Sequence, residues 1–100
     1  MKYHHNWLIL VNNYSEDDFV RLCDLSETTD YLIVGKAVAR TGVLYLECFA
    51  SFTVAKSYVE VKEAVGVCHC TPAIWAAGTI AYCRNCPTVY ECGHRDDVIE

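Results

Sequence analysis

The stretch Trp7-Leu8-Ile9-Leu10-Val11-Asn12-Asn13 places five consecutive apolar residues in front of two asparagines. The β-branched Ile9 and Val11 favour an extended backbone, so the sequence predicts a buried strand over residues 7–13. No uninterrupted apolar run in the chain is longer than this one. Because a helix needs about 20 apolar residues to cross a bilayer, we expect no membrane-spanning segment and no membrane partner.

Helical and extended patterns alternate along the rest of the chain. Ser15, with Asp18 three residues later, is predicted to be a helix N-cap. Gly66 ends a second helical pattern, and Thr71-Pro72 is typical of the start of a third helix. The predicted strands are 7–13, 30–36, 43–52, 67–70 and 88–91, and the predicted helices cover about ten residues after Ser15, then 54–65 and 71–84. This order, with short connections, predicts an α+β fold in which helices pack on a central antiparallel sheet of about five strands.

Length and composition indicate a single globular domain. The chain has 100 residues, of which 53% are apolar and 21% charged, and its formal net charge is −5. These values exclude disordered and low-complexity classes and predict one domain over residues 1–100, with a polar tail over 93–100. An acidic chain is not typical of nucleic-acid binding, because basic residues hold phosphates. The sequence after the first apolar run does not resemble a signal-peptide cleavage site, so we expect an intracellular protein.

Several short stretches, in order along the chain, are similar to the motifs of one known family. They are Asn12-Asn13, Tyr31-Leu32-Ile33-Val34-Gly35, the run TGVLYLECF over 41–49, Cys68-His69, Ala81-Tyr82-Cys83 and Glu91-Cys92-Gly93. Together they resemble the circovirus-type replication-associated proteins, which carry a rolling-circle endonuclease domain of the HUH class. The match covers nearly the whole chain and implies the split β-α-β, ferredoxin-like layout of that family.

The resemblance implies a nicking reaction on single-stranded DNA. In the family, a tyrosine on a helix attacks a phosphodiester, keeps the 5′ phosphate and releases a 3′ hydroxyl. A divalent metal, Mg²⁺ or Mn²⁺, polarises the phosphate and is held by a histidine, the residue two positions later and an acidic residue of the preceding strand. Tyr82 stands at the tyrosine position, Tyr45 at the histidine position and Glu47 two residues later. The same resemblance implies a location in the host nucleus.

The metal motif of this chain departs from the family pattern. The phenol of Tyr45 is a poor ligand for a hard cation, whereas Glu47 can still bind Mg²⁺ or Mn²⁺. Lys36 and Ala37 occupy the place of the acidic ligand, and we expect a lysine there to repel a metal. Asn85 replaces the lysine that follows the tyrosine by one helical turn.

These departures lead to two hypotheses from different classes. The first is a replication-initiator-like domain that binds single-stranded DNA, with Asn12, Asn13 and Arg84 as candidate DNA contacts and with its nicking chemistry lost. Tyr82 would be its nucleophile if activity persists. The second is a non-enzymatic module that binds a protein partner or associates with itself through an apolar face. Purely structural interpretations remain open, with Tyr82 as a helix core residue and Glu47 as the solvent-facing residue of a strand.

The cysteines allow a third hypothesis. Seven cysteines in a chain without an export signal favour reduced thiols or a metal site over a disulfide framework. Cys83, Cys86, Cys92 and His94 supply four ligands of the kind that zinc prefers in tetrahedral sites. The alternatives are a small structural-zinc domain and a set of buried free cysteines.

Overall fold

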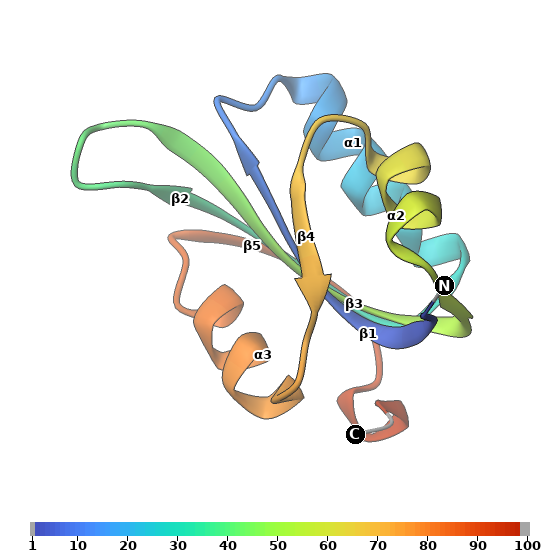
Figure 1. Cartoon of the computed structure of the whole chain (residues 1–100). Helices are drawn as coiled ribbons and strands as arrows, with labels where there is room; N and C mark the ends of the chain where they lie inside the picture. The colour runs from blue at the N-terminus through green and yellow to red at the C-terminus, as the bar shows by residue number, and fades with distance from the viewer. Residues whose placement is uncertain (1, 99–100) are drawn as a thin grey trace.

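The computed structural model describes residues 2–98 as a five-stranded antiparallel sheet with three helices packed on it, which confirms the predicted α+β fold (Figure 1). The strands are β1 (His4–Asn12), β2 (Thr29–Val38), β3 (Leu44–Lys56), β4 (His69–Pro72) and β5 (Thr88–Gly93), and the helices are α1 (Glu16–Asp24), α2 (Tyr58–Val65) and α3 (Ala76–Arg84). The strand order β4-β1-β3-β2-β5 makes β3 the central strand. Among the described residues, no helix has the length and apolarity needed to cross a membrane.

The two faces of the sheet differ in what covers them. Figure 1 shows α1 and α2 on one side of the sheet and α3 on the other. We call the first side the helix-pair face, which is marked by the cross-strand row Ile9, Cys48 and Val34. We call the second side the cleft face, which is marked by the neighbouring row Leu10, Glu47 and Gly35. Because side chains alternate along a strand, adjacent rows point to opposite faces.

Both helices of the helix-pair face start with strong caps. Ser15 and Asp18 form a capping box on α1, as predicted, and Ser57 and Glu60 form another on α2. The two helices and the sheet enclose one apolar core, made of Trp7, Ile9, Val11, Leu22, Leu25, Leu32, Val34, Leu46, Cys48, Ala50, Phe52, Val61, Val65 and Cys68. Burial of this cluster is the main source of stability on this face.

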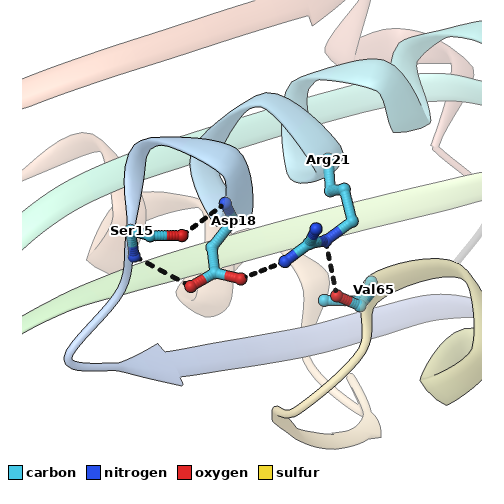
Figure 2. A network of polar contacts seen from close by, with 4 residues as sticks. All are labelled: Ser15, Asp18, Arg21 and Val65. Atoms are coloured by element: carbon cyan, nitrogen blue, oxygen red, sulfur yellow. Dashed lines mark hydrogen bonds and ion pairs between the residues drawn. The ribbon is translucent and has the colours of Figure 1, made fainter.

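A polar link joins the two helices at the edge of that core. Arg21 of α1 donates from Nε to the backbone carbonyl of Val65 at 3.2 Å, and its guanidinium also pairs with the Asp18 carboxylate (Figure 2). The bond satisfies one of the carbonyl groups that the end of α2 leaves without an intrahelical partner. The N-cap of α1 and the C-terminal end of α2 are therefore connected through one arginine.

α3 covers only part of the cleft face. Its buried residues pack on a small sheet cluster, and together they are Ala76, Ile80, Cys83, Tyr31, Ile33 and Phe49. Gly35 of β2 lets the end of α3 approach, since a Cβ there would lie 2.5 Å from Cys86 Sγ and 2.8 Å from the carbonyl oxygen of Cys83. The N-cap residue, Trp75, makes no side-chain hydrogen bond to α3. The helix is thus held by contact with the sheet.

The structure corrects the predicted start of the second helix. The helix predicted over 54–65 begins at Tyr58, because 53–56 extend β3, where Lys56 pairs with His4 of β1. Ser57 then provides the cap that stops the strand and starts the helix. Gly66 ends α2 as predicted, with a φ of 93° that suits glycine.

The third helix also starts later than predicted. Thr71 and Pro72 are the last residues of β4, where they pair with Leu8 and Trp7, and the strand predicted over 67–70 shifts to match. A residue before proline prefers an extended backbone, and a proline is tolerated on an edge strand. The edge pairing with β1 therefore prevails over the local cap signal, and α3 begins at Ala76.

The described part of the C-terminal segment over 93–98 begins with the last residue of β5, and residues 94–97 are exposed. β5 extends through Gly93, a 3-10 helix covers Arg95–Asp97, and Val98 packs against the core of the cleft face. Residues 99–100 of the predicted tail lie outside the described residues. The described part of this segment is therefore folded back on the sheet.

Candidate functional site

A cleft opens on the cleft face between α3 and strands β1 and β3. It has a volume of about 410 Å³ and is lined by Leu8, Leu10 and Glu47 from the sheet and by Trp75, Gly78, Thr79 and Tyr82 from the α3 side. We call it the Glu47 cleft. A second pocket of about 330 Å³ shares Glu47 and Tyr82 with it and is also lined by Ala37, Val38, Tyr45, Asn85, Cys86 and Pro87. Glu47 and Tyr82 therefore belong to both hollows.

Glu47 is a buried acid in the central strand. Its side chain lines the cleft, and the residue is only 8% exposed. Burial raises the pKa of its carboxyl group, which a side-chain hydrogen bond with Tyr45 partly offsets. Among residues 2–98, no basic side chain forms an ion pair with it. The interpretation of Glu47 as a solvent-facing strand residue is wrong, because α3 covers this part of the sheet.

Tyr82 is an exposed residue near the end of α3. It is 72% exposed, whereas the buried residues of the helix are Ala76, Ile80 and Cys83. The helical period places those three on the sheet side and leaves Tyr82 beside them, at the mouth of the cleft. Its interpretation as a core residue is therefore wrong. The phenol is accessible to a ligand that enters either pocket.

Trp75 and Gly78 form a wall of the cleft that sequence analysis did not identify. Trp75 is 71% exposed, and a Cβ on Gly78 would lie 2.3 Å from its ring. The glycine therefore lets the indole lie against α3. The spacing of three residues between an aromatic residue and a glycine at a helix start was the signal that could have indicated this contact.

Leu8 and Leu10 were also missed as lining residues. They alternate with the buried Ile9 and Val11 along β1, so their side chains point to the cleft face. An uninterrupted apolar strand indicates that both faces of the sheet are covered by other parts of the protein. This signal was present in the apolar run over residues 7–11.

The residues at the family's metal positions lie on the cleft face, and Lys36 points to the opposite face. Ala37 pairs with Tyr45 and lines the second pocket. Lys36 points to the opposite face, where its ammonium lies 4.2 Å from the centroid of the Phe19 ring. The expected repulsion of a metal by Lys36 is therefore wrong, because the side chain at the acidic-ligand position is the methyl group of Ala37. Burial and the neighbouring Glu47 raise the pKa of the Tyr45 phenol.

The three predicted DNA contacts differ in their surroundings. Asn12 is exposed at the end of β1, where it pairs with Tyr45 beside the second pocket. Asn13 lies in the following turn with a φ of 52°, and its backbone N–H donates to the carbonyl of Leu44 at 2.8 Å. Arg84 is engaged elsewhere, since it forms an ion pair with Glu91 at 2.7 Å. Of the three, Asn12 is the one with a strand partner, Tyr45, that lines a pocket at Glu47.

The proposed zinc ligands are separated by the sheet. Cys83 is buried under α3 and Cys86 lies against Gly35, both on the cleft face. Cys92 pairs with Leu32, a residue of the helix-pair face, so its side chain points away from α3. Within residues 2–98 there is no group of three or more His, Cys, Asp or Glu side chains placed to hold a metal, and His94 joins no such group.

Comparison with protein families and with curated proteins identifies no relative. No protein-family model matches the chain, and no curated protein matches it significantly. The features that bear on function are therefore those of the cleft itself, which combines a buried acid, exposed aromatic walls and an accessible phenol.

Proposed function

We propose that this chain is a rolling-circle initiator-like domain, similar to that of the circovirus-type replication-associated proteins, which has lost metal-dependent nicking and acts by binding. The observation that carries the proposal is the meeting of Tyr82 and Glu47 at one cleft. The resemblance assigns these residues to the nucleophile and to a metal-ligand position. They come from α3 and β3, elements that are far apart in sequence.

The residues at the family's metal position do not fit a divalent metal. Mg²⁺ and Mn²⁺ prefer several oxygen ligands, of which protein carboxylates are the usual anchors. This chain offers a methyl group from Ala37, a phenol from Tyr45 and one carboxyl group from Glu47, whose pKa is raised by burial. One buried carboxyl group is too few anchors for such an ion. The binding function proposed here therefore involves no metal.

A covalent-adduct assay tests the loss of nicking. The protein is incubated with Mn²⁺ and a labelled single-stranded oligonucleotide of origin type, and we expect no protein–DNA adduct from the wild type or from Tyr82→Phe. An adduct that the wild type forms and Tyr82→Phe does not would overturn the proposal, because the tyrosine would then be an active nucleophile.

Restoring the missing ligands tests whether the metal position is correctly placed. Ala37 and Tyr45 are direct cross-strand partners, and Tyr45 and Glu47 share one face of β3. We expect the double variant Ala37→Glu/Tyr45→His to bind Mn²⁺ more tightly than the wild type in isothermal titration calorimetry. Lys36→Glu is the control, since it adds an acid to the same strand on the opposite face. Equal Mn²⁺ affinity in both variants would contradict the placement.

Single-stranded DNA is the ligand that the resemblance implies. Trp75 and Tyr82 present exposed aromatic rings beside the cleft, and stacking of a base on such a ring contributes about 1–3 kcal/mol. Fluorescence anisotropy with labelled oligothymidylate tests this, and we expect salt-sensitive binding that Trp75→Ala weakens about tenfold. Absence of binding even at low salt would remove DNA as the ligand.

A second candidate function, binding of a protein partner or self-association, is favoured by the distribution of charge. Arg21, Lys36 and Lys62 all make contacts on the helix-pair side, and Arg84 is paired with Glu91. No basic side chain among residues 2–98 lines either pocket at Glu47. Phosphate binding depends on such cations, whereas a protein partner does not need them.

Sedimentation velocity at increasing protein concentration separates the two forms of this second candidate. A dimer that Trp75→Ser weakens would support self-association through the cleft face. A monomer at every concentration would favour a different protein as the partner. Trp75 is suited to the test because it is exposed and makes no side-chain capping bond, so its loss leaves the core intact.

A further inference from the structure

We propose that the Glu47 cleft receives the side chain of an arginine from a protein partner, with Glu47 as its counter-ion and with Trp75 and Tyr82 as its walls. The inference rests on the second candidate function and specifies the chemistry of the partner's anchor. Three observations carry it: the unpaired buried acid, the nature of the walls and the charges around the cleft.

The buried acid lacks a cation of its own. Glu47 is more than nine-tenths buried, and its carboxyl group has a side-chain hydrogen bond with the uncharged Tyr45. A buried carboxylate is costly unless a positive charge compensates it. Residues 2–98 supply no ion-pair partner for Glu47, so a bound cation would provide the compensating charge.

The walls suit a cation with an apolar stem. Trp75 and Tyr82 present exposed rings on the α3 side, and Leu8 and Leu10 present aliphatic side chains on the sheet side. A guanidinium group stacks on aromatic faces and forms paired hydrogen bonds with a carboxylate, and its methylene stem packs on apolar surface. The cleft volume of about 410 Å³ is within the range of ordinary ligand pockets.

None of the titratable groups that the structure describes around Glu47 can act as its counter-ion in place of a bound arginine. The nearest titratable groups are Tyr45 on β3, Tyr82 and Cys83 on α3, and Cys86 just after α3, and none of them is a cation. His69 of β4 lies in the same cross-strand row, with Leu10 between it and Glu47. The net charge of −5 also attracts a basic partner.

The test uses the full chain labelled with ¹⁵N and two short peptides, acetyl-Gly-Arg-Gly-amide and its citrulline counterpart. Citrulline has the shape of arginine without the charge. The chain has two tryptophans, so it gives two indole N–H signals. We expect the arginine peptide to shift the Trp75 signal saturably, and not that of Trp7, which is buried and bonded to the carbonyl of His4. The citrulline peptide should bind about tenfold more weakly.

Two variants with the same change in charge provide the control. Glu47→Gln should weaken arginine binding about tenfold, and Glu63→Gln, an exposed position on α2, should leave it unchanged. Circular dichroism verifies that each variant is folded.

Three outcomes would overturn the proposal. Equal binding of the arginine and citrulline peptides would show an apolar pocket without a counter-ion, and no shift of the Trp75 signal at any peptide concentration would show no site. If oligothymidylate shifts that signal and Glu47→Gln tightens its binding, the cleft is a DNA site. This last outcome would not contradict the proposed initiator-like function. That function would instead be contradicted by a covalent adduct in the nicking assay.

Discussion

The helix-pair face and the cleft face use the same three central strands, but they are covered to different extents. On the helix-pair face, two helices with capping boxes pack over a buried apolar core. On the cleft face, one helix without a side-chain cap covers part of the sheet and leaves a cleft with exposed aromatic walls. The difference indicates that one face provides the stability of the fold and that the other is available for binding.

The largest expected effect comes from a cavity in the helix-pair core. Leu22 of α1 is fully buried, and Leu22→Ala should lower the free energy of unfolding by about 3 kcal/mol. Tyr82→Ala on the cleft face, by contrast, should change it by less than about 0.5 kcal/mol, because Tyr82 is exposed. Urea denaturation followed by circular dichroism measures both. Similar losses in the two variants would contradict the division between the faces.

The next largest effect is expected from Gly35→Ala, which tests how closely α3 packs on the sheet. Gly35→Ala would place a Cβ 2.8 Å from the backbone carbonyl oxygen of Cys83, so the end of α3 must move away from the sheet. We expect a loss of about 2 kcal/mol in unfolding free energy, together with a changed Trp75 indole signal. Adding Cys86→Ala should restore little of the loss, since the carbonyl contact remains. Wild-type stability in Gly35→Ala would show that α3 is loosely placed.

A smaller effect concerns the polar network at the edge of the cleft face. The hydroxyl of Tyr31 donates to the carboxylate of Glu91, which also pairs with Arg84, and these contacts lower the pKa of Glu91 below its ordinary value of 4.5. Glu91→Gln should cost about 1 kcal/mol at neutral pH. A lowered folded-state pKa contributes stability above the unfolded value and loses it as pH falls, so the difference from the wild type should disappear in acid.

That pH dependence can be measured by urea denaturation between neutral pH and about pH 3. Arg84→Gln tests the same network from its other side, because it removes the cation and leaves the hydrogen bond from Tyr31 to Glu91. Its effect should be smaller than that of Glu91→Gln. A cost of Glu91→Gln that stays constant over the whole range would argue that the ionised network contributes nothing.

The smallest expected effect is a gain in stability, from the substitution Glu47→Gln. Burial raises the pKa of Glu47 above its ordinary value of 4.5, so its contribution to stability is present below that value and is lost as pH rises through the folded-state pKa. Glu47→Gln should therefore raise the unfolding free energy at neutral pH by about 0.5 kcal/mol, and the gain should vanish in acid. Thermal unfolding over the same range measures it, with Glu63→Gln as the control. A destabilised Glu47→Gln would contradict the cost of the unpaired acid.

The predictable parts of the fold were those in which local sequence and tertiary contacts agree. Ser15 and Asp18 form the predicted cap, and the apolar run after residue 6 forms a strand. The segment at Thr71-Pro72 failed because its cap signal is local, whereas pairing with β1 is a long-range contact that the sequence does not display.

The site could be predicted only in part, because register decides which face a strand residue occupies. Lys36 and Ala37 were equally suited to the ligand position by sequence, and a shift of one residue moves the side chain across the sheet. The orientation of Tyr82 was open for a related reason. α3 is preceded by the apolar Ile74 and Trp75 and contains further apolar residues, so its pattern did not indicate which side faces the sheet.

The difference between the two faces should be measurable as a difference in the alkylation rates of two buried cysteines. Cys48 is fully buried on the helix-pair face and Cys83 on the cleft face, and burial raises the pKa of both thiols, that of Cys83 to about 12. Neither reacts with an alkylating reagent until its layer opens. Cys83 is therefore modified whenever α3 lifts from the sheet, whereas Cys48 is modified only when the capped helices separate. The ratio of the two alkylation rates gives the difference in opening free energy between the two layers.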